Sequence, residues 1–95
     1  IISVNGITFD IDKMEVKKNN EIINLTSLEL KILYLFITNI GKVITRESLL
    51  NYIYNLTGND VNDNTITVYL KRIREKIGDN IIETKKGIGY IINEK

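Results

Sequence analysis

The sequence contains no cysteine, no histidine and no proline among its 95 residues. Without cysteine the chain has no disulfide, no thiolate nucleophile and no zinc–sulfur site. Without histidine it lacks the commonest general base and the commonest transition-metal ligand. The acidic residues are scattered singly, so no spacing brings two carboxylates together on one helix face for acid–base catalysis. We therefore predict no catalytic site, no metal site and no cofactor, and expect that the protein is not an enzyme.

Long apolar runs are also missing. No run approaches the roughly 20 residues that a membrane-spanning helix needs, and no basic segment leads into an apolar leader. The composition, 43% hydrophobic and 26% charged, is typical of a folded water-soluble domain and excludes a disordered or collagen-like chain. The length suits one domain over residues 1–95. Because the sequence begins with Ile1, we expect this domain to be part of a longer protein.

The charge is unevenly distributed although the formal net charge is only +1. Residues 63–95 hold seven Lys or Arg against five Asp or Glu, whereas residues 1–62 hold six against seven. One cluster has four cations and one carboxylate: Lys71, Arg72, Arg74, Lys76 and Glu75. A second basic pair is Lys85 and Lys86. A polyanion would meet this carboxyl-terminal third, but the same charges would also serve to solvate a helix face, so charge alone leaves both interpretations open.

The first 25 residues alternate between apolar and polar side chains. The apolar positions, spaced by two, are Ile2 and Val4, then Ile7, Phe9 and Ile11, then Met14 and Val16, then Ile23 and Leu25. Asn5-Gly6 and Asn19-Asn20 separate these runs and tolerate the positive φ of tight turns. The pattern predicts an antiparallel meander of three or four short strands. Asp10 and Asp12 are interpreted as solvated charges rather than as metal ligands or a phosphoacceptor.

The periodicity then changes to that of helices. Thr26 begins a Thr-x-x-Glu capping box, which predicts a helix over about residues 27–39. Val43-Ile44 is a candidate for one short strand. Thr45 is the predicted cap of a second helix that ends near residue 55.

A third helix and a hairpin complete the chain. Asn62 or Asp63 can cap a helix that runs to Ile77. Two β-type runs, residues 81–84 and 88–92, flank a glycine-containing turn and predict a hairpin. The order of sheet, three helices and hairpin indicates an α+β fold.

The third helix has two different faces. At 100° per residue one stripe faces the core: Ile66, Leu70, Ile73 and Ile77. The opposite face is mixed: Asn64, Val68, Lys71, Arg72 and Glu75, with Thr65 and Thr67 at its edges. An aliphatic residue is not expected at the centre of a helix face that contacts only water. In a helix that lies in the major groove, Val68 can pack against a thymine methyl group. This favours DNA recognition, although Glu75 argues against it and an acidic protein partner stays open as the alternative.

Four motifs, in order along the chain, resemble the effector domain of OmpR/PhoB-type response regulators. They are Leu25-Thr26-x-x-Glu29-x-x-x-Leu33, Gly41-Lys42-Val43-Ile44-Thr45-Arg46-Glu47-x-Leu49, Asn64-Thr65-Ile66-Thr67-Val68-Tyr69-Leu70-Lys71-Arg72-Ile73-Arg74-x-Lys76-Ile77 and Ile82-x-Thr84-x-Lys86-Gly87-Ile88-Gly89-Tyr90. The resemblance as a whole extends over essentially all 95 residues, in the same order and with the expected gaps. The resemblance implies a winged helix-turn-helix with an N-terminal antiparallel four-stranded sheet, three helices and a C-terminal β-hairpin wing.

The resemblance also implies a function, namely sequence-specific binding of double-stranded DNA for bacterial transcription regulation. The domain would be the cytoplasmic output domain of a two-component response regulator, with its third helix in the major groove and its wing at the minor groove. The implied DNA contacts are Asn64, Thr65, Val68, Tyr69, Lys71, Arg72 and Arg74 on the helix and Thr84 and Lys86 on the wing.

Further partners follow from the same resemblance. The domain would dimerise on tandem or paired half-sites of DNA. RNA polymerase would contact the loop around residues 55–62. A cognate sensor kinase would act through a receiver domain that precedes this segment, although some relatives carry a different sensory domain there.

The sequence departs from the family pattern at several contact positions. Asn64, Lys71 and Lys86 stand where arginine is common, Tyr69 where histidine is common, and Tyr54 where tryptophan is common. Lysine lacks the bidentate fork with which arginine binds guanine. The resemblance therefore implies DNA binding without implying the family's preferred DNA sequence.

The remaining conspicuous residues are expected to have structural roles. Half-buried packing is predicted for three tyrosines: Tyr34, Tyr52 and Tyr54. Tyr90 is expected to anchor the core or the sheet, and Gly87 and Gly89 to serve the turn and the strand twist. Arg46 stays open between a phosphate contact and pairing near Glu47.

Overall fold

The amino-terminal alternation forms a four-stranded antiparallel sheet in the computed structural model, which describes residues 1–59 and 62–94. The strands are β1 (Ile2–Val4), β2 (Ile7–Asp10), β3 (Glu15–Lys18) and β4 (Glu21–Ile22), paired in that order. Asn5, Asn19 and Asn20 have φ values of 49°, 55° and 66°, which confirms the two predicted turns. The inward-facing residues Val4, Ile7, Phe9 and Val16 are buried.

One detail of the predicted meander is wrong. Met14 does not continue the alternation of β3, because it lies in the turn of residues 11–14 with a φ of 51°. Asp10 closes this turn by accepting a hydrogen bond from the Lys13 amide through Oδ1 at 3.1 Å. A side-chain oxygen that bonds a nearby backbone amide competes with continued strand structure, which periodicity alone does not detect.

The first two helices begin where their caps predict. In α1 (Ser27–Ile37) the Thr26 hydroxyl accepts from the Glu29 amide at 3.2 Å, and the Glu29 carboxylate accepts from the Thr26 amide at 3.0 Å. The helix ends at Ile37, two residues earlier than predicted, with Thr38 as its C-cap. In α2 (Arg46–Thr57) the Thr45 hydroxyl accepts from the Ser48 amide, and the helix continues two residues beyond the prediction.

The third helix, α3 (Asp63–Ile77), is capped by Asn62, whose Oδ1 accepts from the Thr65 amide at 3.0 Å. This decides between the two predicted caps. The apolar stripe of α3 is buried as predicted, since Ile66, Leu70 and Ile73 are at most 1% exposed. That stripe packs into the common core of the helices and sheets.

The hairpin and the segment before α2 form a second sheet with the strand order β5-β7-β6. Its strands are β5 (Ile44–Thr45), β6 (Glu83–Lys85) and β7 (Gly89–Ile91). The strand predicted at residues 43–44 therefore exists, shifted by one residue. A Cβ atom on Gly89 would overlap the backbone carbonyl of Ile44, so only glycine permits β5 and β7 to lie this close.

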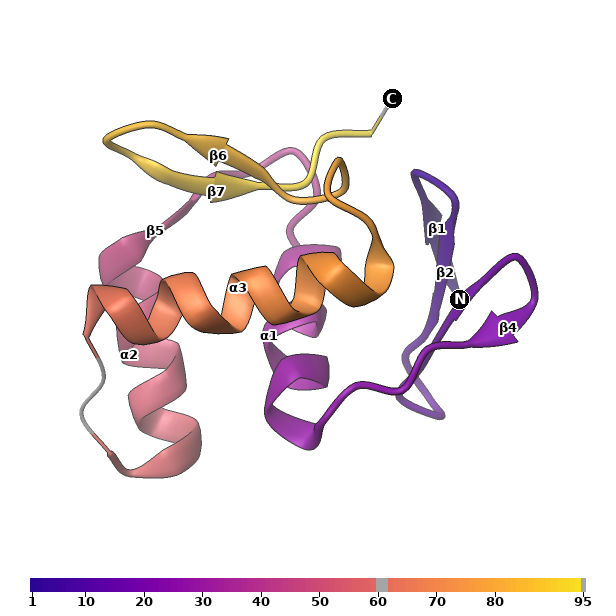
Figure 1. Ribbon diagram of the computed structural model, residues 1–95, viewed down its shortest axis with the longest axis horizontal. Helices are drawn as coiled ribbons and strands as arrows, with labels where there is room; N and C mark the ends of the chain where they lie inside the picture. Colours follow the sequence, from indigo (N-terminus) through magenta and orange to yellow (C-terminus); the bar gives the residue numbers. More distant parts are fainter. Residues whose placement is uncertain (60–61, 95) are drawn as a thin grey trace.

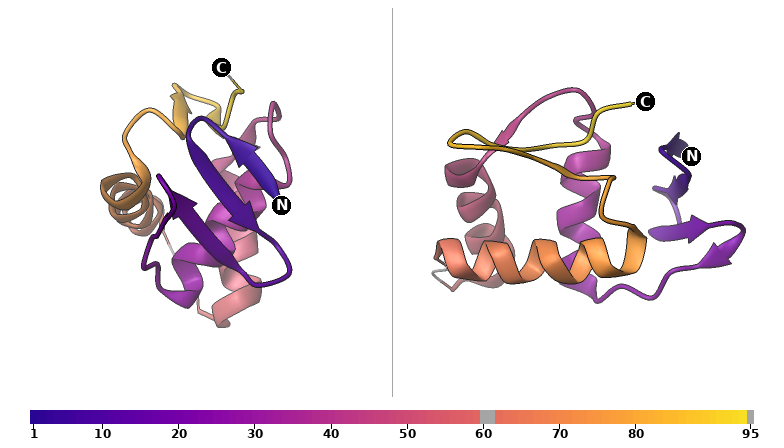
Figure 2. Two further views of the ribbon diagram at one scale, coloured as in Figure 1. Left: turned by 90° about the vertical axis from the view of Figure 1, so that its right-hand side faces the viewer. Right: turned by 45° about the horizontal axis from the view of Figure 1, so that its top comes forward.

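Helix α3 runs across the molecule beneath the β6–β7 hairpin, and the four-stranded sheet lies beside the carboxyl end of α3 (Figure 1). The hairpin turn reaches toward the opposite end, above α2 and the amino end of α3, as the right-hand view of Figure 2 also shows. The four-stranded sheet and the hairpin tip are therefore at opposite ends of α3. None of the helices in the described ranges is long and apolar enough to cross a membrane.

Half-buried packing was predicted for three tyrosines, and the structure confirms it for two of them. Tyr34 and Tyr52 are half-buried, and the Tyr52 hydroxyl donates to the Lys31 carbonyl at 2.9 Å. Tyr54 is 48% exposed, so its predicted packing role is wrong. Helix α2 buries Leu49 and Ile53, and one helical step of 100° turns Tyr54 away from that stripe.

Candidate nucleic-acid interface

The mixed face of α3 is open to solvent. Asn64, Lys71 and Arg72 are exposed, and Val68 at the centre of the face is 45% exposed. Within residues 1–59 and 62–94, no hydrogen bond or ion pair engages the side chains of Asn64, Lys71 or Arg72. Because the fold does not use these groups, they are available to a partner.

The amino half of α3 carries a shallow groove. The groove is lined by Asn62, Asn64, Thr65, Val68, Tyr69 and Arg72. All of these except Asn62 are predicted contacts, so the groove contains five of the nine. Thr65 is half-buried and its hydroxyl donates to the Asn62 cap at 3.2 Å. Tyr69 is half-buried and packs against the core. The groove therefore combines an apolar centre at Val68 with polar groups on both sides, which is the mixture that base edges require.

The hairpin tip forms a second, cationic hollow. Thr84 and Lys86 are exposed there, and their contact with DNA stays a prediction. The hollow is lined by Arg46, Thr84, Lys85, Lys86, Gly87, Ile88, Gly89 and Tyr90. Ile88, absent from the predicted contacts, is 60% exposed at this tip. No periodicity singles out one residue of a hairpin turn, so only the structure places Ile88 at the surface.

Arg74 has a role that the sequence did not reveal. Its Nε and Nη2 atoms donate to the Ile82 carbonyl at 3.1 and 2.8 Å, and Nη2 donates to the Thr84 hydroxyl at 3.0 Å. Its guanidinium carbon also lies 5.9 Å from the centre of the Tyr90 ring. Arg74 thus joins α3 to the base of the hairpin, and its predicted contact with DNA stays a prediction.

Tyr90 is 5% exposed, so it anchors the sheet as predicted. The Arg46 guanidinium carbon lies 5.7 Å from its ring centre, within the range of cation–π attraction. Arg46 therefore packs on the tyrosine and lines the cationic hollow at the same time. This position is compatible with a phosphate contact, which stays a prediction, as does pairing near Glu47.

The two surfaces belong to one end of the molecule. The hairpin turn and the amino end of α3 lie toward the same end of the molecule in Figure 1 and in the right-hand view of Figure 2. Arg74 joins α3 to the base of the hairpin. A groove with a valine at its centre and a cationic hairpin tip beside it offers base-edge contacts and phosphate contacts together. Among the described residues no group of three or more His, Cys, Asp or Glu is placed to hold a metal ion.

The family model for "Transcriptional regulatory protein, C terminal" matches residues 19–92. The chain belongs to this family. Response regulator ArlR of Staphylococcus aureus is 38% identical over 96 residues, which cover 97% of this chain and 43% of that protein. The chain therefore spans less than half the length of the curated relatives it matches.

Solved structures give the same result. The response regulator DrrB of Thermotoga maritima, an OmpR/PhoB homologue, aligns with a TM-score of 0.86 at 29% identity, covering 96% of this chain and 43% of that chain. The DNA-binding domain of Klebsiella pneumoniae RstA, solved in complex with the RstA box, aligns with a TM-score of 0.80 at 27% identity over 97% of this chain and 95% of that one.

These findings confirm the resemblance to OmpR/PhoB-type effector domains and the winged-helix fold. The chain is a C-terminal domain of the kind found in transcriptional regulatory proteins, and it is similar in fold to the DNA-binding domain of the response regulator RstA. They do not favour the alternative of a module that docks an acidic protein.

Proposed function

We propose that this domain recognises specific double-stranded DNA sequences and regulates bacterial transcription as the output domain of a two-component response regulator. The observation that carries the proposal is the exposed mixed face of α3, which lies at the same end of the molecule as the cationic hairpin tip. On this face the side chains of Asn64, Lys71 and Arg72 have no partner among residues 1–59 and 62–94. A helix and a hairpin so arranged fit a major groove and the adjacent minor groove. The proposed role places the domain in the cytoplasm, where it acts without a cofactor and without enzymatic activity.

The proposed contacts divide by chemistry. Lys71 and Arg72 bind phosphates or the O6 and N7 atoms of guanine, and Val68 contacts a thymine methyl group. Asn64 is suited to an adenine, whose N6 and N7 atoms match an amide. Lys86 neutralises a phosphate beside the wing. The remaining proposed contacts are Thr65, Tyr69, Arg74 and Thr84.

Three partners complete the proposal. The domain dimerises on tandem or paired half-sites about one helical turn, or roughly 34–36 Å, apart. A cognate sensor kinase acts through a receiver domain, which suits relatives of more than twice this length. RNA polymerase contacts the loop around residues 55–62, of which residues 60–61 lie outside the described residues. Residues 55–57 of this segment form the end of α2. The exposure of Leu56 within the segment and of Tyr54 just before it supports this contact.

Selection of duplexes from a random pool tests the proposal. We expect the protein to enrich one short motif and to bind it with an affinity that falls steeply with salt. A motif repeated at a spacing of one helical turn supports dimeric binding. Enrichment of no motif, with equally weak binding of all duplexes, contradicts sequence-specific recognition. Absence of binding even at low salt contradicts DNA binding altogether and returns the acidic protein partner as the explanation of the basic face.

A further inference from the structure

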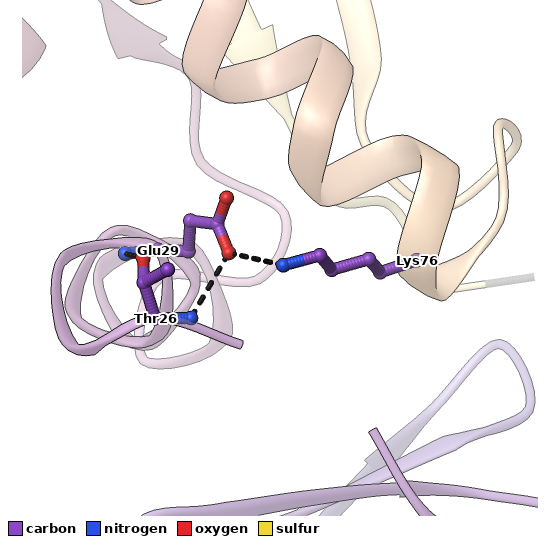
Figure 3. Close-up of polar contacts among 3 residues, drawn as sticks. All are labelled: Thr26, Glu29 and Lys76. Carbon is purple, nitrogen blue, oxygen red and sulfur yellow. Dashed lines mark hydrogen bonds and ion pairs between the residues drawn. The ribbon is translucent and has the colours of Figure 1, made fainter. Parts of the chain in front are cut away.

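The carboxyl end of α3 is held by polar contacts from two elements outside the proposed DNA-binding surface. Lys18, the last residue of β3, donates from Nζ to the backbone carbonyl of Ile77 at 3.1 Å. Lys76 Nζ pairs with Oε1 of Glu29, in the first turn of α1, at 2.8 Å (Figure 3). Lys18 and Glu29 are 59 and 47 residues away in sequence from the residues they hold. We call Lys18, Glu29 and Lys76 the α3 anchor.

Glu29 is the one buried charged residue among those whose burial the structure describes, and its side chain is 3% exposed. Burial disfavours its charged form and raises its pKa. Hydrogen bonds from Lys76 and from the Thr26 amide, together with the charge of Lys76, outweigh that effect, so the pKa of Glu29 lies below its usual value of 4.5. The carboxylate is therefore ionised at neutral pH, and the same oxygen accepts from both Thr26 and Lys76.

Lys18 meets α3 where the helix ends. The last carbonyls of a helix lack intrahelical partners and carry the negative end of the helix dipole, so a cation there is stabilising. Gly78, directly after the helix, has a φ of 117°, and a Cβ atom on it would lie 3.2 Å from Lys18 Nζ. The Lys18 ammonium therefore sits close against the end of the helix, reached from the four-stranded sheet.

These hydrogen bonds and the ion pair fix the orientation of the α3 axis, which the apolar stripe of α3 does not do. Burial of apolar surface is non-directional, so the stripe alone permits small tilts of the helix. The 15 residues of α3 span about 22 Å at 1.5 Å per residue. A tilt of about 5° about the carboxyl end would move the amino end by about 2 Å on that length. Hydrogen bonds to bases tolerate only about 0.5 Å in donor–acceptor distance.

We infer that Lys18 and Glu29 are positioning residues for DNA recognition. They fix the carboxyl end of α3, and thereby the direction in which the exposed amino half meets the groove. Glu29 is buried and Lys18 reaches α3 from the sheet at the far end from the hairpin tip, so both act through α3 and not by touching DNA. The inference rests on the proposed function in so far as the duplex is the measured ligand.

Lys18→Met tests the sheet contact, with Lys17→Met as the matched control. Lys17 is the preceding residue of β3, is exposed, and pairs with Thr8 and Ile22 across the sheet. For each variant the affinities for the duplex selected by the wild type and for a scrambled duplex are compared. The temperature is one at which circular dichroism shows every variant folded. We expect Lys18→Met to lower the ratio of the two affinities about fivefold and Lys17→Met to leave it unchanged.

The ratio distinguishes positioning from the other roles open to Lys18. Loss of a distant charge weakens both duplexes alike and leaves the ratio constant. Lys18→Arg keeps a cationic donor and is expected to restore the ratio. A Lys18→Met variant with a lower melting temperature and an unchanged ratio would show that Lys18 only stabilises the fold and would overturn the inference. An equal loss in Lys17→Met would overturn it as well.

The Glu29 contact is tested by Glu29→Gln, Lys76→Met and the double variant. Glutamine keeps an oxygen for the Thr26 amide and removes the charge that pairs with Lys76. If the two residues act as one contact, each single variant lowers the ratio equally and the double variant lowers it no further. Additive losses would show independent roles and contradict the assignment of Glu29.

The orientation of α3 is also measurable without DNA. Residual dipolar couplings of the backbone amides report the direction of α3 relative to α1 and the four-stranded sheet. We expect that direction to change in Lys18→Met and to stay constant in Lys17→Met. Unchanged couplings in Lys18→Met overturn the inference. If the wild type prefers no duplex, the proposed function fails, and the couplings still decide whether Lys18 positions the helix.

Discussion

The two ends of α3 differ in what the fold demands of them. From the amino end to just past the middle of the helix, the outward side chains of Asn64, Val68 and Arg72 make no polar contact with the described remainder of the chain. Near the carboxyl end, Arg74 and Lys76 each bind another element, and the last carbonyl accepts from the sheet. All four cations of α3 lie in its carboxyl half, yet only the two nearest its end, Arg74 and Lys76, are used to hold the structure.

The comparison shows that a basic helix need not present all of its charges to DNA. Cations paired within the protein position the helix, whereas unpaired cations remain for phosphates and bases. Substitutions of the paired residues Arg74 and Lys76 should therefore lower the free energy of unfolding, and substitutions of the unpaired residues Asn64, Lys71 and Arg72 should lower DNA affinity alone. The predictions below test this separation, beginning with the largest expected effect.

Arg74→Ala should have the largest effect on folding. It removes three hydrogen bonds to Ile82 and Thr84 and a stacking contact on Tyr90, so we expect the free energy of unfolding to fall by about 3 kcal/mol. Urea denaturation measures this. Unchanged stability would mean that α3 and the hairpin are joined by other contacts and that Arg74 is available to DNA.

Glu29→Ala should lower the free energy of unfolding by about 2 kcal/mol, because it removes half of the capping box and the partner of Lys76. Thermal or urea denaturation measures the change. Glu29→Gln is the control, since its amide oxygen still accepts from Thr26, and it should cost less. Equal losses in the two variants would show that the ion pair, rather than the cap, carries the stability.

Arg72→Ala should leave stability within about 0.5 kcal/mol and weaken binding of the selected duplex about tenfold, or 1.4 kcal/mol. Fluorescence anisotropy at fixed salt measures the affinity, and a scrambled duplex should lose less. Wild-type affinity in this variant would contradict the assignment of Arg72 to the groove. Lys71→Ala provides the neighbouring comparison on the same face.

Lys86→Ala should weaken all duplexes by a similar factor of less than about tenfold, because a phosphate contact carries no sequence information. The slope of log affinity against log salt should become shallower by about one unit. Titrations at several salt concentrations measure this. A loss confined to the selected duplex would instead place Lys86 at a base.

The pH dependence of stability should show the smallest effect. Because the pKa of Glu29 is lower in the folded protein than its usual 4.5, the folded state binds this proton less tightly than the unfolded state does. The resulting stabilisation is complete above about pH 4.5 and is lost as the pH falls through the lower, folded-state pKa. The difference in unfolding free energy between wild type and Glu29→Gln should shrink over that range, and a constant difference would contradict the pKa shift.

Local signals predicted most of the fold. The caps at Thr26 and Thr45, the asparagine turns and the apolar stripe of α3 all depend on residues within a few positions of one another, and the structure confirms them. The errors at Met14 and Tyr54 arose where periodicity was extended past its end. There a side-chain hydrogen bond or a single helical step decided the outcome.

The sequence predicted which residues belong to the candidate site, but not which of them are free to contact DNA and which are bonded within the fold. The outward positions of α3 follow from 100° per residue, so Asn64, Val68 and Arg72 could be placed on one face from the sequence alone. Nothing in the spacing separates Arg72 from Arg74, although one is unpaired and the other is bound to the hairpin. The exposure of Ile88 at the hairpin tip likewise could not be predicted from the sequence.

The sequence by itself determined the order of the elements, the buried stripe of α3 and the family to which the chain is similar, because these depend on neighbours along the chain. Only the tertiary structure decided which charges are paired. Lys18 with Ile77, Glu29 with Lys76 and Arg74 with Ile82 join different elements of the fold. Two of these pairs span more than forty residues. Such partners meet only after the core has brought their elements together.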